Sequence, residues 1–196
     1  MGEHYFSQAP SSAHEARVFS FAYRGRSLAF ETDAGVFSKA HVDKGTALLL
    51  EALPERFTGR ALDLGCGWGA MGVCMAAAWP EADVNLTDIN GRAVAIAREN
   101  LARNRLAAIV TQGDGLSGLE GRFGLIATNP PIRAGKDAVY RLFQESVERL
   151  DGEGEFYIVI RKQQGADSAL KFLRGLMDEV EVVSRGGGGY RVLRGR

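Results

Sequence analysis

The sequence predicts an α/β protein with a mostly parallel, seven-stranded sheet and an antiparallel C-terminal hairpin. Short apolar runs rich in β-branched residues alternate with segments of helical spacing over residues 43–177, which indicates right-handed βαβ units. Glycine-rich or polar turns end four consecutive strand-like runs. The last two runs flank the four glycines at 186–189, which predicts a turn between neighbouring strands.

An aromatic and β-branched stretch at residues 16–33 precedes these units and is interrupted at Arg24-Gly25. It predicts a β-hairpin that serves as a lid or an appendage. We then expect helices at 43–53, 68–79, 91–105, 137–150 and 168–177. We expect strands at 60–65, 82–90, 107–114, 122–129, 154–161, 179–185 and 190–194. Asn90 is expected to cap the third helix. The chain thus divides into a hairpin extension and lid, residues 1–42, and one compact domain, residues 43–196.

Composition limits the partners that this chain can bind. A chain of 196 residues with 45% hydrophobic content is expected to form one domain. Its 24 basic and 24 acidic side chains cancel, which argues against binding nucleic acid through bulk charge, so any RNA contact must be local. Cys66 and Cys74 show neither disulfide nor zinc spacing, and the start MGEHYFSQAP lacks the apolar core of a signal peptide. We therefore expect a cytoplasmic protein without a metal site or membrane span. The oligomeric state stays open, with a monomer favoured.

Polar or glycine-rich residues stand at four consecutive predicted strand ends, which meet at one edge of a parallel sheet. The first strand releases Gly65, Gly67 and Gly69, which permit a tight turn and close approach of backbone amides to a ligand. Asp88 ends the second strand about 20 residues on, at the spacing of a ribose-binding acid. Asp114 follows the third strand. For the first two features, an ordinary glycine turn with a solvent-facing Asp88 is the alternative.

The fourth strand ends in TNPPIRAGK, residues 128–136. Proline fixes its own φ and keeps the preceding residue out of the helical region, so Asn129 and Pro130 are expected to be extended. This corner displays one side-chain amide and backbone carbonyls at the edge of the sheet. An ordinary strand-ending loop is the alternative, and the residues at the three neighbouring strand ends argue against it.

This order of motifs resembles the class I methyltransferases that use S-adenosylmethionine: LDLGCGWG, an acid ending the second strand, GD after the third, and NPP with an apolar residue after the fourth. The segments FETDAGVFSKAHVDKGTALLLEAL, TDINGRAVAIARENLARN and TNPPIRAGK are similar to the small-domain methyltransferases related to the ribosomal RNA guanine-N2 methyltransferases of the RsmC and RlmG type. The resemblance covers residues 6–194 and implies a Rossmann-like class I methyltransferase fold. Gly124 departs from the pattern, since such enzymes often carry aspartate there. The chain also has only a short extension where the two-domain RNA enzymes have a further domain.

The resemblance implies a role for individual residues. Asp63 and the loop after it would hold the amino-acid end of the cofactor, Asp88 the ribose and Asp114 the adenine. The expected cofactor site comprises Phe37, Ser38, Thr46, Asp63, Gly65, Cys66, Gly67, Asp88, Ile89, Gly113, Asp114, Gly115 and Asn129. The expected catalytic set is Asn129, Pro130, Pro131 and Ile132. The expected RNA contacts are Lys39, Arg133 and Lys136.

The chemistry explains the corner at Asn129. An exocyclic amine on a base is a weak nucleophile because its lone pair is delocalised into the ring. The Asn129 side-chain oxygen and the Pro130 carbonyl can accept its two hydrogens and direct the lone pair. Deprotonation can follow methyl transfer, so no histidine base is needed. Ile132 stands where many adenine enzymes carry an aromatic residue, which favours guanine or a non-base amide; a base within a helix would have to be extruded.

We therefore expect an S-adenosylmethionine-dependent methyltransferase acting on guanine N2 in ribosomal RNA. The alternatives are a protein glutamine methyltransferase, a non-catalytic cofactor-binding partner of RNA and, more remotely, an NAD-dependent dehydrogenase. Arg185, Arg191, Arg194 and Arg196 place four positive charges and no acid in the last dozen residues. They are expected either to contact RNA phosphates or to be solvated.

Overall fold

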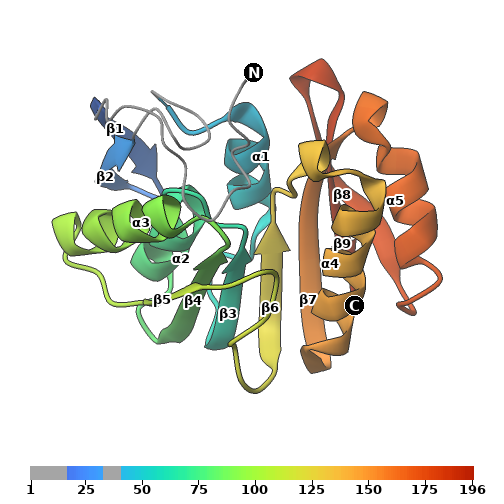
Figure 1. Cartoon of the computed structure of the whole chain (residues 1–196). Helices are drawn as coiled ribbons and strands as arrows, with labels where there is room; N and C mark the ends of the chain where they lie inside the picture. The colour runs from blue at the N-terminus through green and yellow to red at the C-terminus, as the bar shows by residue number, and fades with distance from the viewer. Residues whose placement is uncertain (1–16, 33–40) are drawn as a thin grey trace.

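The computed structural model describes residues 17–32 and 41–196, and its centre is one seven-stranded sheet. The strands are β3 (Gly59–Leu64), β4 (Ala82–Asp88), β5 (Ile109–Gln112), β6 (Phe123–Thr128), β7 (Leu150–Arg161), β8 (Val180–Gly186) and β9 (Tyr190–Gly195). Their order across the sheet is β5-β4-β3-β6-β7-β9-β8 (Figure 1). The first five strands of this order, β5, β4, β3, β6 and β7, run parallel to one another. Strand β9 is antiparallel to both β7 and β8. The predicted sheet, with its antiparallel C-terminal hairpin, is confirmed.

Helices cover both faces of the sheet. They are α1 (Lys44–Ala52), α2 (Ala70–Ala78), α3 (Gly91–Arg103), α4 (Lys136–Glu148) and α5 (Ala166–Leu173). The first three contribute buried residues to one core and the last two to a second core on the opposite face (Figure 1). Alternate residues of β7 enter the two cores, Tyr157 the first and Phe156 the second, as the pleat of a strand requires. Within the described ranges, no helix is both long enough and apolar enough to span a bilayer.

Some element boundaries differ from those expected. β7 begins at Leu150 and not at Gly154, because Leu150 pairs with Phe123 across a register shift. Helix α4 correspondingly ends at Glu148. β5 is shorter than expected, because its ladder with β4 begins only at Ile109. Periodicity alone cannot place such ends, which depend on the pairing partner.

The predicted hairpin is formed by β1 (Arg17–Tyr23) and β2 (Arg26–Thr32). Arg24 (φ 46°) and Gly25 (φ 75°) have left-handed backbone, the conformation of a tight turn that matches the right-handed twist of its strands. Tyr23, Leu28 and Phe30 are buried in the same core as helices α1 to α3. The apolar face of the hairpin is therefore packed against the body of the protein.

Helix α2 is apolar all round and lies close against the sheet, with residues 71–77 all buried. Gly72 permits this approach, since a Cβ there would lie 2.4 Å from the Leu86 side chain of β4. The Gly72 N–H also donates to the carboxylate of Asp63 on β3, at 2.7 Å. The packing of this helix thus helps to position a buried acid at the edge of the sheet.

We expect Gly72→Ala to lower the free energy of unfolding by about 1–3 kcal/mol, the usual cost of overpacking, in spite of the higher helix propensity of alanine. Thermal and urea unfolding followed by circular dichroism measure this change. Gly152→Ala is the matched control, because a Cβ at Gly152 meets nothing within 4 Å. Two variants of equal stability would contradict the close contact between α2 and Leu86.

Candidate active site

The ends of four adjacent strands are hydrogen-bonded to one another. The Gly65 and Cys66 N–H groups, after β3, both donate to the Thr87 carbonyl of β4 at 2.9 Å. The Gly113 N–H, after β5, donates to the Asp88 carbonyl at 3.0 Å. The Thr128 hydroxyl, at the end of β6, donates to the Leu64 carbonyl at 2.8 Å. The polar residues predicted at separate strand ends are thus brought to one edge of the sheet.

The loop after β3 has the backbone that its glycines predict. Gly65, Gly67 and Gly69 have φ values of 73°, 55° and 86°, in the left-handed region that favours glycine. Gly65 is exposed, and a Cβ built on it would meet no atom of the described residues within 4 Å. Cys66 is buried between these glycines, and burial raises the pKa of its thiol well above the ordinary value. The loop therefore offers exposed backbone at Gly65, whereas the Cys66 thiol is buried and favours its protonated form.

Asp63 is a buried carboxylate that uses only one of its two oxygens within the described part of the chain. Its Oδ2 accepts the Gly72 N–H, whereas Oδ1 has no hydrogen-bond partner among residues 17–32 and 41–196. Burial raises the pKa of Asp63 to about 7; the Gly72 N–H opposes this shift and the nearby charge of Asp88 adds to it. A buried acceptor without a partner is suited to a cationic or hydrogen-bond-donating ligand group.

Asp88 differs from the solvent-facing acid that the sequence suggested as an alternative. It is only 6% exposed. Its Oδ2 accepts the Gly67 N–H at 2.8 Å and its Oδ1 accepts the Asn90 N–H at 2.9 Å. Burial raises the pKa of Asp88, and backbone N–H groups oppose the shift. The residue at the end of β4 therefore fixes the glycine loop, and its expected contact with the ribose of a ligand stays a prediction.

The turn after β5 is only partly as expected. Gly113 is tightly packed, since a Cβ there would lie 2.4 Å from the Ser117 carbonyl oxygen. Gly115 is buried with φ 61°, and Ile89 is half-buried beyond β4. The Asp114 side chain is 58% exposed and pairs with Arg141 of α4 at 2.8 Å. Its expected contact with adenine stays a prediction.

Asn129 is held by two residues of the α1 N-terminus. Its Nδ2 donates to both Asp43 carboxylate oxygens at 3.3 Å and to Thr46 Oγ1 at 3.1 Å. Asp43 also caps α1 by accepting the Gly45 and Thr46 N–H groups. Since the amide nitrogen is occupied in this way, the orientation of the Asn129 side-chain oxygen is fixed.

Sequence reasoning did not assign Asp43 to the site. The signal was present as an N-cap aspartate in DKGT, but such a residue ordinarily stabilises only its own helix. Its contact with Asn129 joins positions 86 residues apart, which a single sequence does not reveal.

The proline corner is more compact than expected. The Ile132 N–H donates to the Pro130 carbonyl at 2.9 Å, and Pro131 has φ −75° and ψ 74°, the values of an inverse γ-turn. The Pro130 oxygen keeps a second lone pair for another donor. Pro130 is buried, and the half-buried Ile132 packs against the core beneath α4 and α5.

The predicted RNA contacts are distributed unevenly. Arg133 and Lys136 are exposed just beyond the corner, and the Lys136 ammonium lies 5.1 Å from the centroid of the Tyr140 ring. Phe37, Ser38 and Lys39, predicted for the cofactor and RNA, lie outside the described residues.

Three of the four C-terminal arginines form ion pairs with acids from other parts of the chain. Arg191 pairs with Asp167, and Arg196 pairs with Glu179 at 2.5 Å. Arg194 forms ion pairs with Glu155 and Glu181. The acids come from α5, β7, β8 and the residue before β8, so these three arginines are paired within the protein, and their contact with RNA phosphates stays a prediction.

The raised pKa of Asp63 predicts a pH-dependent stability. Because its pKa in the folded protein lies above the ordinary 3.8, protonated Asp63 favours folding, and this contribution is lost as the pH rises through about 7. Asp63→Asn keeps an oxygen for the Gly72 N–H but cannot ionise. Between about pH 5 and pH 8, we expect the Tm of the wild type to fall relative to that of Asp63→Asn.

The exposed Asp151→Asn is the control for this experiment, and its Tm should stay parallel to the wild type over the same interval. Parallel curves for Asp63→Asn as well would show that Asp63 ionises as an ordinary carboxylate.

Comparisons with known proteins agree with this geometry. The family model described as methyltransferase small domain matches residues 27–194. The uncharacterized protein YbxB of Bacillus subtilis (strain 168) is 41% identical over 194 residues, which cover 97% of this chain and 96% of that protein. Ribosomal RNA small subunit methyltransferase C of Haemophilus influenzae (strain PittGG) is 40% identical over 129 residues, 64% of this chain and 39% of that enzyme.

A solved structure extends the similarity. The T. thermophilus 16S rRNA N2 methyltransferase RsmC, in complex with AdoMet and guanosine, has a TM-score of 0.84 and 28% identity. The match covers 95% of this chain and 52% of that one. This chain thus spans about half or less of the ribosomal RNA enzymes named here. Since the family model covers residues 27–194, the chain belongs to the methyltransferase small domain family and has the Rossmann-like fold of class I methyltransferases.

Proposed function

We propose that this protein is an S-adenosylmethionine-dependent N-methyltransferase that methylates guanine N2 in ribosomal RNA. The observation that carries the proposal is Asn129, whose amide nitrogen is held by Asp43 and Thr46 so that its oxygen has a fixed direction at the sheet edge. The similarity to ribosomal RNA small subunit methyltransferase C and to RsmC supports the choice of substrate. A ribosomal RNA substrate is also consistent with the cytoplasmic location expected from the sequence.

The residues at the first two strand ends fit the cofactor. Asp63 Oδ1 is a buried acceptor that no described residue uses, and it is suited to the ammonium group of the methionine part. A ligand could lie against the backbone of Gly65, where a Cβ would contact none of the described residues. Asp88 and Ile89 would bind the ribose side, and Gly113, Asp114 and Gly115 the adenine side. When bound, the cofactor supplies a methyl group activated by a sulfonium leaving group.

The chain itself orients the target amine. Asn129 Oδ1 and the second lone pair of the Pro130 carbonyl accept the two amine hydrogens, which turns the nitrogen lone pair toward the methyl group. Donation from Asn129 Nδ2 to a carboxylate fixes the amide and increases the negative charge on its oxygen. No residue has to remove a proton first, because the nitrogen becomes acidic once it is methylated.

Two exposed basic residues next to the proline corner would guide RNA to it. Arg133 and Lys136 are exposed beside Pro131 and Ile132, and they would contact phosphates without reading sequence. Lys39 is the remaining member of this proposed set. In this proposal residues 1–42 act as a hairpin extension and lid, and residues 43–196 act as the catalytic domain.

We expect Asn129→Ala to bind S-adenosylmethionine with nearly unchanged affinity but to turn over about 10²–10³-fold more slowly, because it loses one preorganised transition-state hydrogen bond. Calorimetry measures binding, and transfer of labelled methyl to ribosomal RNA measures turnover. Gln144→Ala, which removes an exposed amide of α4, is the control and should retain both properties.

Nuclease digestion of the labelled RNA should place the methyl on guanine N2, with none on adenine N6. Label on protein glutamine would show that the substrate is a protein and not ribosomal RNA. Cofactor binding without transfer to any acceptor would indicate a non-catalytic partner of RNA. A fully active Asn129→Ala enzyme would overturn the mechanism.

Thr46 distinguishes support of Asn129 from direct cofactor binding. Thr46→Val keeps the shape of the side chain but removes the oxygen that accepts from Asn129 Nδ2 and the hydroxyl that donates to Asp43. We expect kcat to fall about tenfold, as for one hydrogen bond, with the KM for S-adenosylmethionine nearly unchanged. The exposed Thr58→Val is the control. A raised KM with unchanged kcat would instead make Thr46 a cofactor residue, as the sequence suggested.

A further inference from the structure

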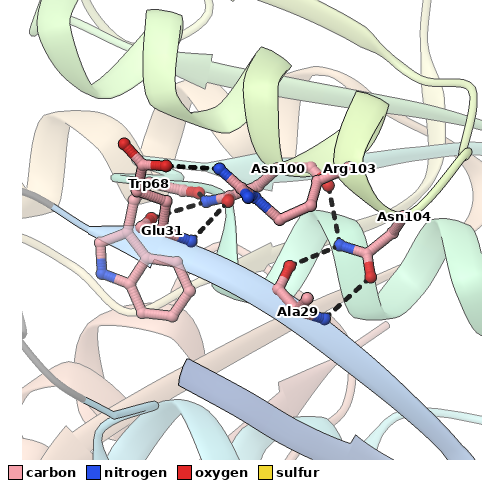
Figure 2. Close-up of polar contacts among 6 residues, drawn as sticks. All are labelled: Ala29, Glu31, Trp68, Asn100, Arg103 and Asn104. Atoms are coloured by element: carbon pink, nitrogen blue, oxygen red, sulfur yellow. Dashed lines mark hydrogen bonds and ion pairs between the residues drawn. The ribbon is translucent and has the colours of Figure 1, made fainter. Parts of the chain in front are cut away.

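Asn100 of helix α3 and Asn104, the C-cap of that helix, bind the free edge of strand β2. Asn104 accepts the Ala29 N–H at 2.9 Å and donates to the Ala29 carbonyl at 2.7 Å. One helical turn earlier, Asn100 accepts the Glu31 N–H at 2.7 Å and donates to the Glu31 carbonyl at 2.9 Å. Each side chain thus pairs with the hairpin as a neighbouring strand would (Figure 2).

Asn100 makes one contact that Asn104 does not. Its Nδ2 also donates to the Trp68 carbonyl at 2.8 Å, within the glycine loop after β3 (Figure 2). Asn100 is fully buried, and both of its N–H donors and its carbonyl oxygen are in use. A single side chain therefore joins the hairpin to the loop.

Aromatic packing adds a second link between the hairpin and the loop. The Trp68 ring meets Phe19 of β1 and Phe30 of β2 edge-on, with centroid distances of 5.6 and 5.1 Å. The Trp68 carbonyl and ring are thus both held from outside the loop. Its neighbour Gly67 is held from inside, by the carboxylate of Asp88.

We infer that Asn100 is a positioning residue for the cofactor loop and that the β1–β2 hairpin is thereby a fixed part of the cofactor site. A loop that must present its backbone to a ligand binds more tightly when it is ordered beforehand, because less conformational entropy is lost on binding. Asn100 holds the Trp68 carbonyl, and Asp88 holds the N–H group of the preceding residue, Gly67. The two contacts together fix the middle of the glycine loop. The inference rests on the proposed use of S-adenosylmethionine.

Asn104 separates this role from simple attachment of the hairpin. It directly follows the last residue of the same helix and forms the same reciprocal pair with β2. Its remaining bond goes to the Asn100 carbonyl within α3 and not to the loop. If the asparagines only attach the hairpin, replacing either one should affect cofactor binding equally.

The test is calorimetric titration of S-adenosylmethionine into the full chain, as wild type, Asn100→Ala and Asn104→Ala, with the Tm of each. Both variants should melt at a lower temperature. Only Asn100→Ala should bind the cofactor more weakly, by about tenfold as for one lost hydrogen bond, with kcat at saturating cofactor near that of the wild type.

If Asn100→Ala does not fold, the inference can be tested on the wild type instead. By amide hydrogen exchange, saturating S-adenosylmethionine should slow exchange at the Glu31 N–H, which binds Asn100, more than at the Ala29 N–H, which binds Asn104. Equal slowing at the two amides would overturn the inference, as would equal losses of affinity in the two variants. A wild type that does not bind the cofactor would overturn the proposed function as well.

Discussion

Two buried carboxylates at the ends of neighbouring strands constrain the rest of this structure. Asp63 and Asp88 lie away from water, where a charged group is costly unless donors surround it. The donors are backbone N–H groups from the first turn of α2, from the glycine loop and from the residue before α3. Gly67, in the loop between β3 and α2, therefore takes part in holding Asp88, and Gly72 of α2 takes part in holding Asp63.

Asparagine side chains connect the segments that the sheet does not. An amide can donate and accept at once, so one residue can join a strand edge, a loop and a helix without introducing charge. Asn90 caps α3, Asn100 joins the hairpin to the glycine loop, and Asn129 joins the end of β6 to the start of α1. The edge of the sheet thus becomes one hydrogen-bonded assembly contributed by distant parts of the chain.

The fold class could be predicted from the sequence, because the spacing of apolar residues and the glycines in turns are local properties that identify each strand and helix. The sequence also predicted that the polar and glycine-rich strand ends lie together, since the carboxyl ends of parallel strands share an edge. The sequence could not predict which residues contact each of these side chains. The burial of Asp88 depends on backbone donors from two loops, and the pairing of Asp43 with Asn129 depends on contacts between distant segments. The C-terminal arginines lack acids nearby in sequence but meet Asp167 and Glu179 in space.

Strand β9 follows β8 in the chain but lies between β7 and β8 in the sheet. During synthesis on the ribosome, β7 and β8 therefore emerge with nothing to join them, and each presents unpaired backbone until β9 has left the exit tunnel. Unpaired strand edges are where nascent chains associate wrongly with one another. Strand β7 can pair with β6 as soon as both have emerged, whereas β8 joins the described sheet only through β9.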